Sequence, residues 1–94
     1  MNQYRKKIDD NHVEIVNFIE SIPSCAVLDL NRVGGGCTDL LVQYKRAGIC
    51  KLFLIEIKTE KGKLNPKQID FHKKFECHIA RTTDDVLHIL GIEC

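Results

Sequence analysis

The sequence predicts a small α/β domain, in which a mixed four-stranded sheet is flanked by helices in the order αβββαβα. Three observations lead to this prediction. An amphipathic stretch comes first, three apolar strand-like segments then follow one another with short turns, and a helix start separates the third segment from a fourth. The 94 residues are enough for one core, so we expect a single domain over residues 1–94.

The chain begins with a predicted helix over residues 9–22, which Pro23 ends. Its apolar positions recur with helical spacing. They are Ile15, Val16, Ile19 and Ile22. The first strand is expected over residues 25–30.

A glycine-rich loop, residues 31–36, leads into a predicted hairpin. Its arms are residues 38–44 and 50–58, and residues 45–48 form the turn. The second arm is apolar on both faces. We therefore expect it in the middle of the sheet, covered on both sides.

The next helix is predicted from its capping signals. Asn65 is a suitable N-cap, Pro66 suits the first turn, and Gln68 can close a capping box. We expect this helix to run to about residue 76 and to bury part of three apolar side chains. These are Ile69, Phe71 and Phe75.

A short strand over residues 78–81 and a last helix complete the fold. Thr83 is the expected cap of that helix, and the acidic residues that follow it suit a first helical turn. Four apolar side chains are expected to pack inward. They are Val86, Leu87, Ile89 and Leu90.

Composition excludes several classes of protein. No apolar run approaches the ~20 residues that a membrane-spanning helix needs, and the basic N-terminus lacks the apolar stretch of a signal peptide. The five cysteines are odd in number and include no C-x-x-C pair. A disulfide framework is therefore not expected, and a reducing, intracellular compartment fits better.

Two carboxylates are predicted to meet across the hairpin. Asp39 interrupts one apolar arm and Glu56 interrupts the other. If the turn centres near Ala47 and Gly48, the two residues pair closely, and cross-strand neighbours lie ~5 Å apart at Cβ. Oxygen ligands of this kind suit Mg²⁺ or Mn²⁺. Such an ion would keep several waters, one of which is the candidate nucleophile.

Lys58 lies two residues after Glu56, so both side chains project from the same face of the strand. The ammonium could orient the water or stabilise charge on a phosphate. This set of groups is suited to metal-assisted phosphodiester hydrolysis. The alternative is a surface Glu–Lys pair on an edge strand, which a strand with two apolar faces disfavours.

Two further residues have competing interpretations. Glu14 either reaches over the sheet as an additional metal-directed carboxylate or is simply exposed to solvent. Gln68 either only caps its helix or also turns toward the water or the scissile phosphate. The four histidines show no ligand spacing, so a zinc site is disfavoured.

The positive charge is unevenly distributed, although the net charge is only +1. Six lysines lie between residues 58 and 74 and form either a solvated face or a surface that holds a phosphate backbone. The predicted nucleic-acid contacts are Lys61, Lys63, Lys67, Gly35 and Gly36. The glycines lack the Lys-Ser/Thr of a P-loop, and we interpret them as a mobile approach to Asp39.

Taken together, these motifs resemble a known family. The segment G-C-T-D-L-L-V at 36–42, the E-I-K at 56–58 and the G-K-L-N-P-K-Q at 62–68 look like those of the VRR-NUC family in the PD-(D/E)XK nuclease superfamily. The E-x-K pair alone is weak, whereas the three motifs in this order are specific. Thr38 stands where the family often has proline.

The resemblance implies a restriction-endonuclease-like fold and Mg²⁺- or Mn²⁺-dependent DNA cleavage by a minimal domain of phage or bacterial type. It implies a triad of Asp39, Glu56 and Lys58, support from Glu14 and Gln68, and the Ile57 backbone carbonyl as a further metal ligand. It also implies a homodimer, and it leaves open whether the DNA is branched. Two rival functions remain: a nucleic-acid-binding module without activity, and a nuclease subunit active only with a replication or repair partner.

Overall fold

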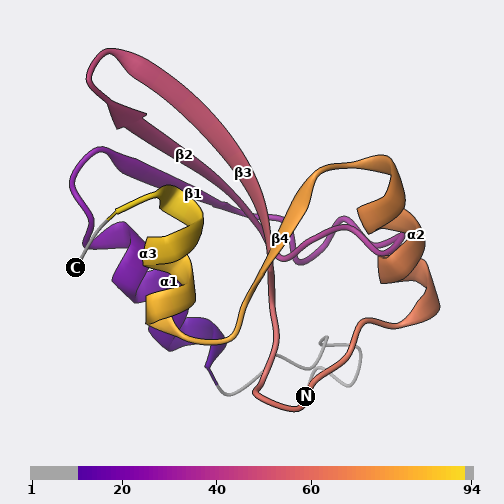
Figure 1. Ribbon diagram of the computed structural model, residues 1–94. Coiled ribbons are helices and arrows are strands. Elements are labelled where there is room, and N and C mark those ends of the chain that lie inside the picture. The colour runs from indigo at the N-terminus through magenta and orange to yellow at the C-terminus, as the bar shows by residue number, and fades with distance from the viewer. Residues whose placement is uncertain (1–10, 93–94) are drawn as a thin grey trace.

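The computed structural model describes residues 11–92, and its elements follow the predicted order αβββαβα (Figure 1). Residues 9 and 10 of the predicted first helix lie outside the described residues. The elements are α1 (His12–Glu20), β1 (Cys25–Asp29), β2 (Leu40–Arg46), β3 (Ile49–Ile57), α2 (Pro66–Lys74), β4 (Cys77–Ala80) and α3 (Thr83–Leu90). No helix among the described residues is long and apolar enough to cross a membrane.

The four strands form one mixed sheet in the order β1-β2-β3-β4. The first three pair antiparallel, and β4 pairs parallel to β3 after the α2 connection. The prediction that the strand carrying Glu56 lies inside the sheet is thus confirmed. A tight turn at Ala47 and Gly48 joins β2 to β3, and both residues have positive φ (52° and 80°). Positive φ at both central residues is what a type I′ hairpin turn needs, and this turn sets the register.

The core lies on one face of the sheet, under α1 and α3 (Figure 1). The side chains of Leu40 and Val42 on β2 and of Ile55 and Ile57 on β3 point to this face and are fully buried. The remaining buried apolar side chains come mainly from the two helices. They are Ile15, Ile19, Ala80, Val86 and Leu90.

The opposite face of the sheet, which we call the outer face, is covered only near one end. The expectation that the third strand is covered on both sides is therefore wrong for much of its length. Leu52 on β3 is 63% exposed and Leu28 on β1 is 57% exposed. The reason is the position of α2, which lies beyond one end of the sheet (Figure 1).

The same position of α2 corrects a second expectation. Ile69 is 42% exposed and Phe75 is 50% exposed, so these side chains contribute little to the core, and only Phe71 is half-buried. The rings of Phe71 and Phe75 pack on each other instead, with centroids 4.6 Å apart. The helix ends at Lys74 because Phe75 adopts an extended backbone, two residues earlier than predicted.

Both later helices begin with capping boxes. The predicted box of Asn65 and Gln68 is confirmed, with reciprocal hydrogen bonds of 2.9 Å. The predicted cap of α3 is off by one residue. Thr82 is the N-cap because Asp85, three residues later, bonds back to the Thr82 amide.

Candidate active site

Asp39 and Glu56 lie at the covered end of the outer face. Leu40 pairs with Ile55 in the antiparallel ladder, so the next position brings Asp39 opposite Glu56. Because strand side chains alternate, both carboxylates point away from the core face that holds Ile55. Asp39 is 8% exposed and Glu56 is 2% exposed. The hairpin register thus brings two buried carboxylates to neighbouring positions, as the sequence predicted, with Asp39 just before β2 and Glu56 within β3.

Asp39 is held by the strand that carries Glu56. Its Oδ2 accepts a hydrogen bond from the Ile57 amide at 2.8 Å. The Ile57 amide would otherwise donate to a neighbouring strand. It donates to the Asp39 side chain instead, because β2 begins only at Leu40. A hydrogen bond to a backbone N–H fixes the orientation of the carboxylate.

Glu56 has two neighbours from the predicted site. The Gln68 side chain donates from Nε2 to Glu56 Oε2 at 3.2 Å, and the Lys58 ammonium lies 4.0 Å from the same oxygen. The Lys58 side chain is 15% exposed. A buried carboxylate is costly unless it is paired, and here an amide and a cation lie beside it. Gln68 therefore caps α2 with its Oε1 and contacts Glu56 with its Nε2, so the capping interpretation is confirmed and the contact with a water or phosphate stays a prediction.

The glycine-rich loop packs against the first turn of α2. A Cβ on Gly36 would lie 2.2 Å from the Lys67 carbonyl oxygen, and Gly36 has φ of +82°. Only glycine fits both conditions. The backbone that comes close to Gly36 is therefore that of α2. Gly36 is half-buried, and its packing against α2 helps to place Gln68.

Other predicted residues lie outside this group. Glu14 is exposed on α1, which matches the solvent-exposed alternative. The predicted nucleic-acid contacts other than Gly36 are exposed. They are Gly35, Lys61, Lys63 and Lys67.

Two residues that the sequence analysis did not single out hold the segment after β3. Arg81 donates from Nη1 to the carbonyl oxygens of Thr59 at 2.5 Å and Gly62 at 2.7 Å. Asn11 donates to the carbonyl oxygens of Lys58 and Arg81, both at 2.9 Å. These bonds join residues far apart in the chain, so no local pattern could reveal them. They fix the backbone at Lys58 and the loop that carries Lys61 and Lys63.

Burial shifts two titratable groups near Glu56. It lowers the pKa of His72, and the Lys58 ammonium lowers that pKa further. Burial also raises the pKa of the Cys77 thiol, with smaller contributions from Cys37 and Glu56. Both shifts favour the neutral form of the group concerned.

The residues can be compared with the needs of a metal ion. Within residues 11–92 no group of three or more His, Cys, Asp and Glu side chains could hold a metal ion. Two buried carboxylates do lie together, and Mg²⁺ typically takes one or two protein carboxylates and completes its shell with water and substrate phosphate. The donor set suits a hard, partly hydrated cation.

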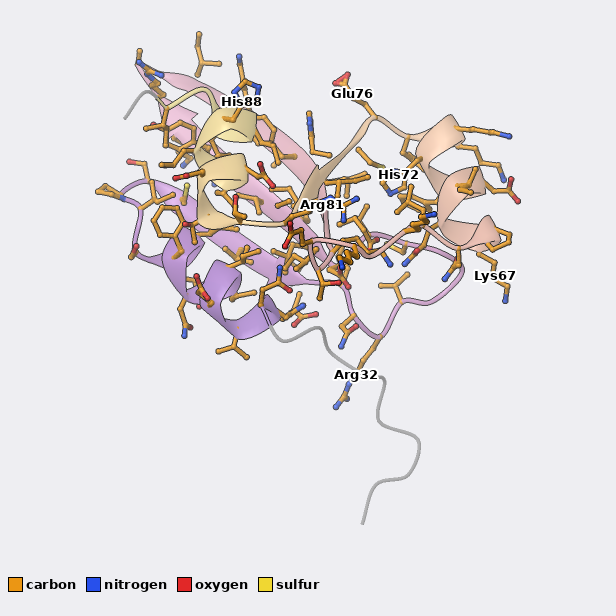
Figure 2. The ribbon with its side chains drawn as sticks, turned by 60° about the horizontal axis from the view of Figure 1, so that its bottom comes forward. Arg32, Lys67, His72, Glu76, Arg81 and His88 are labelled. Carbon is orange, nitrogen blue, oxygen red and sulfur yellow. The ribbon has the colours of Figure 1, made fainter. Side chains whose placement is uncertain are left out.

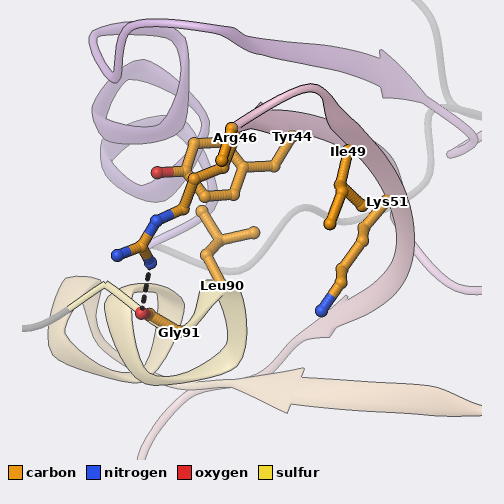
Figure 3. Close-up of a pocket in the computed structure, with 7 residues that line it drawn as sticks. Tyr44, Arg46, Ile49, Lys51, Leu90 and Gly91 are labelled. Carbon is orange, nitrogen blue, oxygen red and sulfur yellow. Dashed lines mark hydrogen bonds between the residues drawn. The ribbon is translucent and has the colours of Figure 1, made fainter.

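A cavity of about 340 Å³ lies beside the turn of the β2–β3 hairpin (Figure 3). The strand register puts the two carboxylates at the other end of the hairpin. Tyr44, Arg46 and Lys51 line one side and Leu90 and Gly91 the other, and Arg46 donates to the Gly91 carbonyl oxygen at 3.1 Å. None of the predicted site residues lines this cavity. It has no part in the site described above.

Comparisons of the chain with protein-family models, with curated proteins and with solved structures find no match.

Proposed function

We propose that the chain is a metal-dependent DNA endonuclease that hydrolyses phosphodiester bonds, with Asp39, Glu56 and Lys58 as its catalytic residues. The observation that carries the proposal is the buried pair of carboxylates beside a lysine, assembled from two strands and covered by Gln68. Grouped buried charges are expensive for a domain of this size, and they commonly mark a functional site. The resemblance to the VRR-NUC nucleases supports the same reading.

The carboxylates would hold the cation. Asp39 keeps one orientation because Oδ2 is bonded to the Ile57 amide, and Glu56 is oriented by Gln68. The Ile57 carbonyl, between Glu56 and Lys58 in the chain, is a third oxygen donor that we assign to the same ion. A bound Mg²⁺ or Mn²⁺ would lower the pKa of water and neutralise charge on the scissile phosphate.

Lys58 would act on the phosphate. Its ammonium lies near Glu56 at the end of β3, and the Asn11 and Arg81 contacts fix its backbone. As water adds to phosphorus and a P–O bond to the deoxyribose breaks, negative charge grows on the phosphoryl oxygens. A cation in a partly buried site stabilises that charge more strongly than one in open water.

The surroundings of the site suit a polyanion. Lys61 and Lys63 lie on the loop after β3, and Lys67 lies in the first turn of α2. Figure 2 shows Arg32 and Lys67 projecting outward, from the glycine-rich loop and from α2 respectively. These exposed cations lie on the glycine-rich loop, on the loop after β3 and on α2. Together they would hold a phosphate backbone against the two carboxylates.

The direct test is to incubate the purified chain with linear, flap and four-way-junction DNA, with EDTA or with added Mn²⁺. We expect cleavage of at least one substrate only with the metal. Salt-sensitive DNA binding without cleavage of any substrate would support the binding-module alternative. Cleavage only after addition of a replication or repair protein would support the subunit alternative.

A further inference from the structure

His72 lies one helical turn after Gln68 on α2. Residues four apart share a helix face, so the imidazole points the same way as the amide that reaches Glu56. Figure 2 shows His72 on the side of α2 that faces the sheet. The ring thus belongs to the same end of the outer face as the two carboxylates.

The Nε2 atom of His72 is buried and makes no hydrogen bond to any described residue. Buried polar nitrogens in native proteins nearly always have a partner, so this atom needs an explanation. Burial and the neighbouring Lys58 ammonium both lower the pKa of the ring. A neutral imidazole has one nitrogen that can accept a hydrogen bond.

The Lys58 ammonium is a nearby hydrogen-bond donor whose direction its ion pair with Glu56 does not fix. Its Nζ is 4.0 Å from Glu56 Oε2, which is an ion-pair distance and too long for a hydrogen bond. The ammonium carries three donors on a flexible four-carbon stem. An ion pair at 4.0 Å does not fix the direction of the ammonium hydrogens, whereas the proposed chemistry requires a defined direction.

We propose that His72 is the positioning residue for Lys58, and that its Nε2 lone pair accepts a hydrogen bond from the Lys58 ammonium in the working site. One ammonium hydrogen then faces Glu56, a second faces His72, and the third is free for the scissile phosphate. This role rests on the proposed nuclease function. His72 acts through Lys58 and has no contact of its own with the DNA.

Activity measurements can distinguish whether His72 acts as a hydrogen-bond acceptor or only fills space. Gln can replace the Nε2 acceptor with an amide oxygen, whereas Leu fills the space with no acceptor. We expect His72→Leu to lower kcat about tenfold with little change in KM, and His72→Gln to stay within about threefold of the unchanged protein. The matched control is His88→Leu on α3, an exposed histidine away from the site (Figure 2). Equal losses in His72→Leu and His72→Gln would overturn the proposal.

A second measurement does not depend on activity. Long-range ¹H–¹⁵N correlation spectra of the histidine rings report which nitrogen carries the proton in the neutral form. We expect the His72 proton on Nδ1, with Nε2 bare, and we expect Lys58→Met to raise the pKa of His72. A proton on Nε2, or a His72 titration unchanged in Lys58→Met, would overturn the proposal. A chain that cuts no DNA but shows both expected spectra would contradict the nuclease function alone and leave the Lys58–His72 pairing in place.

Discussion

The Asp39 carboxylate accepts a hydrogen bond from the Ile57 amide, with 2.8 Å between Oδ2 and the nitrogen. The bond ties the first acidic residue of the site to the strand that supplies the second, Glu56. It forms one residue before β2 begins, so a side-chain hydrogen bond replaces backbone pairing at this position. The proposed chemistry needs an oriented carboxylate there. The geometry of the site therefore depends on the hairpin register.

We expect Glu56→Gln and Lys58→Ala each to reduce DNA cleavage by about a hundredfold or more while leaving the protein folded. Gln keeps the shape of Glu56 but removes its charge, and Ala removes the Lys58 ammonium. A plasmid-nicking assay, with circular dichroism as the check of folding, measures both effects. Glu76→Gln and Lys45→Ala are matched controls, because both residues are exposed. A fully active Glu56→Gln protein would contradict the proposed site.

Cleavage is expected to require Mg²⁺ or Mn²⁺, and Ca²⁺ is expected to support DNA binding without turnover. Ca²⁺ takes more ligands at longer distances and activates water poorly, whereas the two carboxylates suit the smaller ions. Cleavage in EDTA and in each metal, with binding measured in parallel by fluorescence anisotropy, tests this. Strong cleavage in EDTA that added metal does not change would exclude the mechanism.

Gly36→Ala should destabilise the protein far more than Gly35→Ala. Both glycines have positive φ, so alanine costs roughly 1–2 kcal/mol at either position. Only at Gly36 would the new methyl group meet the Lys67 carbonyl oxygen, at 2.2 Å, whereas nothing lies within 4 Å of the same position at Gly35. Thermal unfolding should show a fall of about 4–8 °C per kcal/mol. Equal Tm values for the two variants would mean that Gly36 does not pack against α2.

His72 should make stability depend on pH below about 6.5. Its pKa is lowered in the folded state by burial and then by Lys58, so the unfolded chain binds the proton more readily. The unfolding free energy is therefore expected to fall as pH drops through the ordinary histidine value toward the lowered one. Urea unfolding between pH 8 and pH 5 should show a shallower decline in His72→Gln. An identical decline in both proteins would show that His72 titrates normally.

The pairing of Asp39 with Glu56 could be predicted because local signals determine it. A two-residue turn at Ala47 and Gly48 sets the register, and the position of each acid in an apolar strand then follows. Gln68 was likewise marked by its capping box.

The remaining features depend on how α2 is placed in space. Its position beyond the end of the sheet leaves Leu52 exposed and puts His72 on the side of α2 that faces the sheet, although His72 showed no ligand spacing in the sequence (Figures 1 and 2). Arg81 reaches back about twenty residues to the loop after β3, a contact that no sequence period reports. Side-chain contacts between segments far apart in the chain are not encoded in local patterns.

The chain is expected to act as a homodimer whose two sites face one continuous DNA surface. A 94-residue domain has little surface with which to hold a duplex, and a two-fold axis would double the lysines around the site and match the symmetry of a junction. The exposed apolar side chains Leu28 and Leu52 on the outer face offer a surface that such pairing could bury. Light scattering at micromolar concentration should give twice 10.8 kDa. If the outer face forms the interface, Leu52→Glu should lower that mass. Val33→Glu, which changes an exposed residue of the glycine-rich loop, is the control and should not lower it. A mass near 10.8 kDa without DNA, and one protein chain per complex when DNA and Ca²⁺ are added, would mean that the chain works as a monomer.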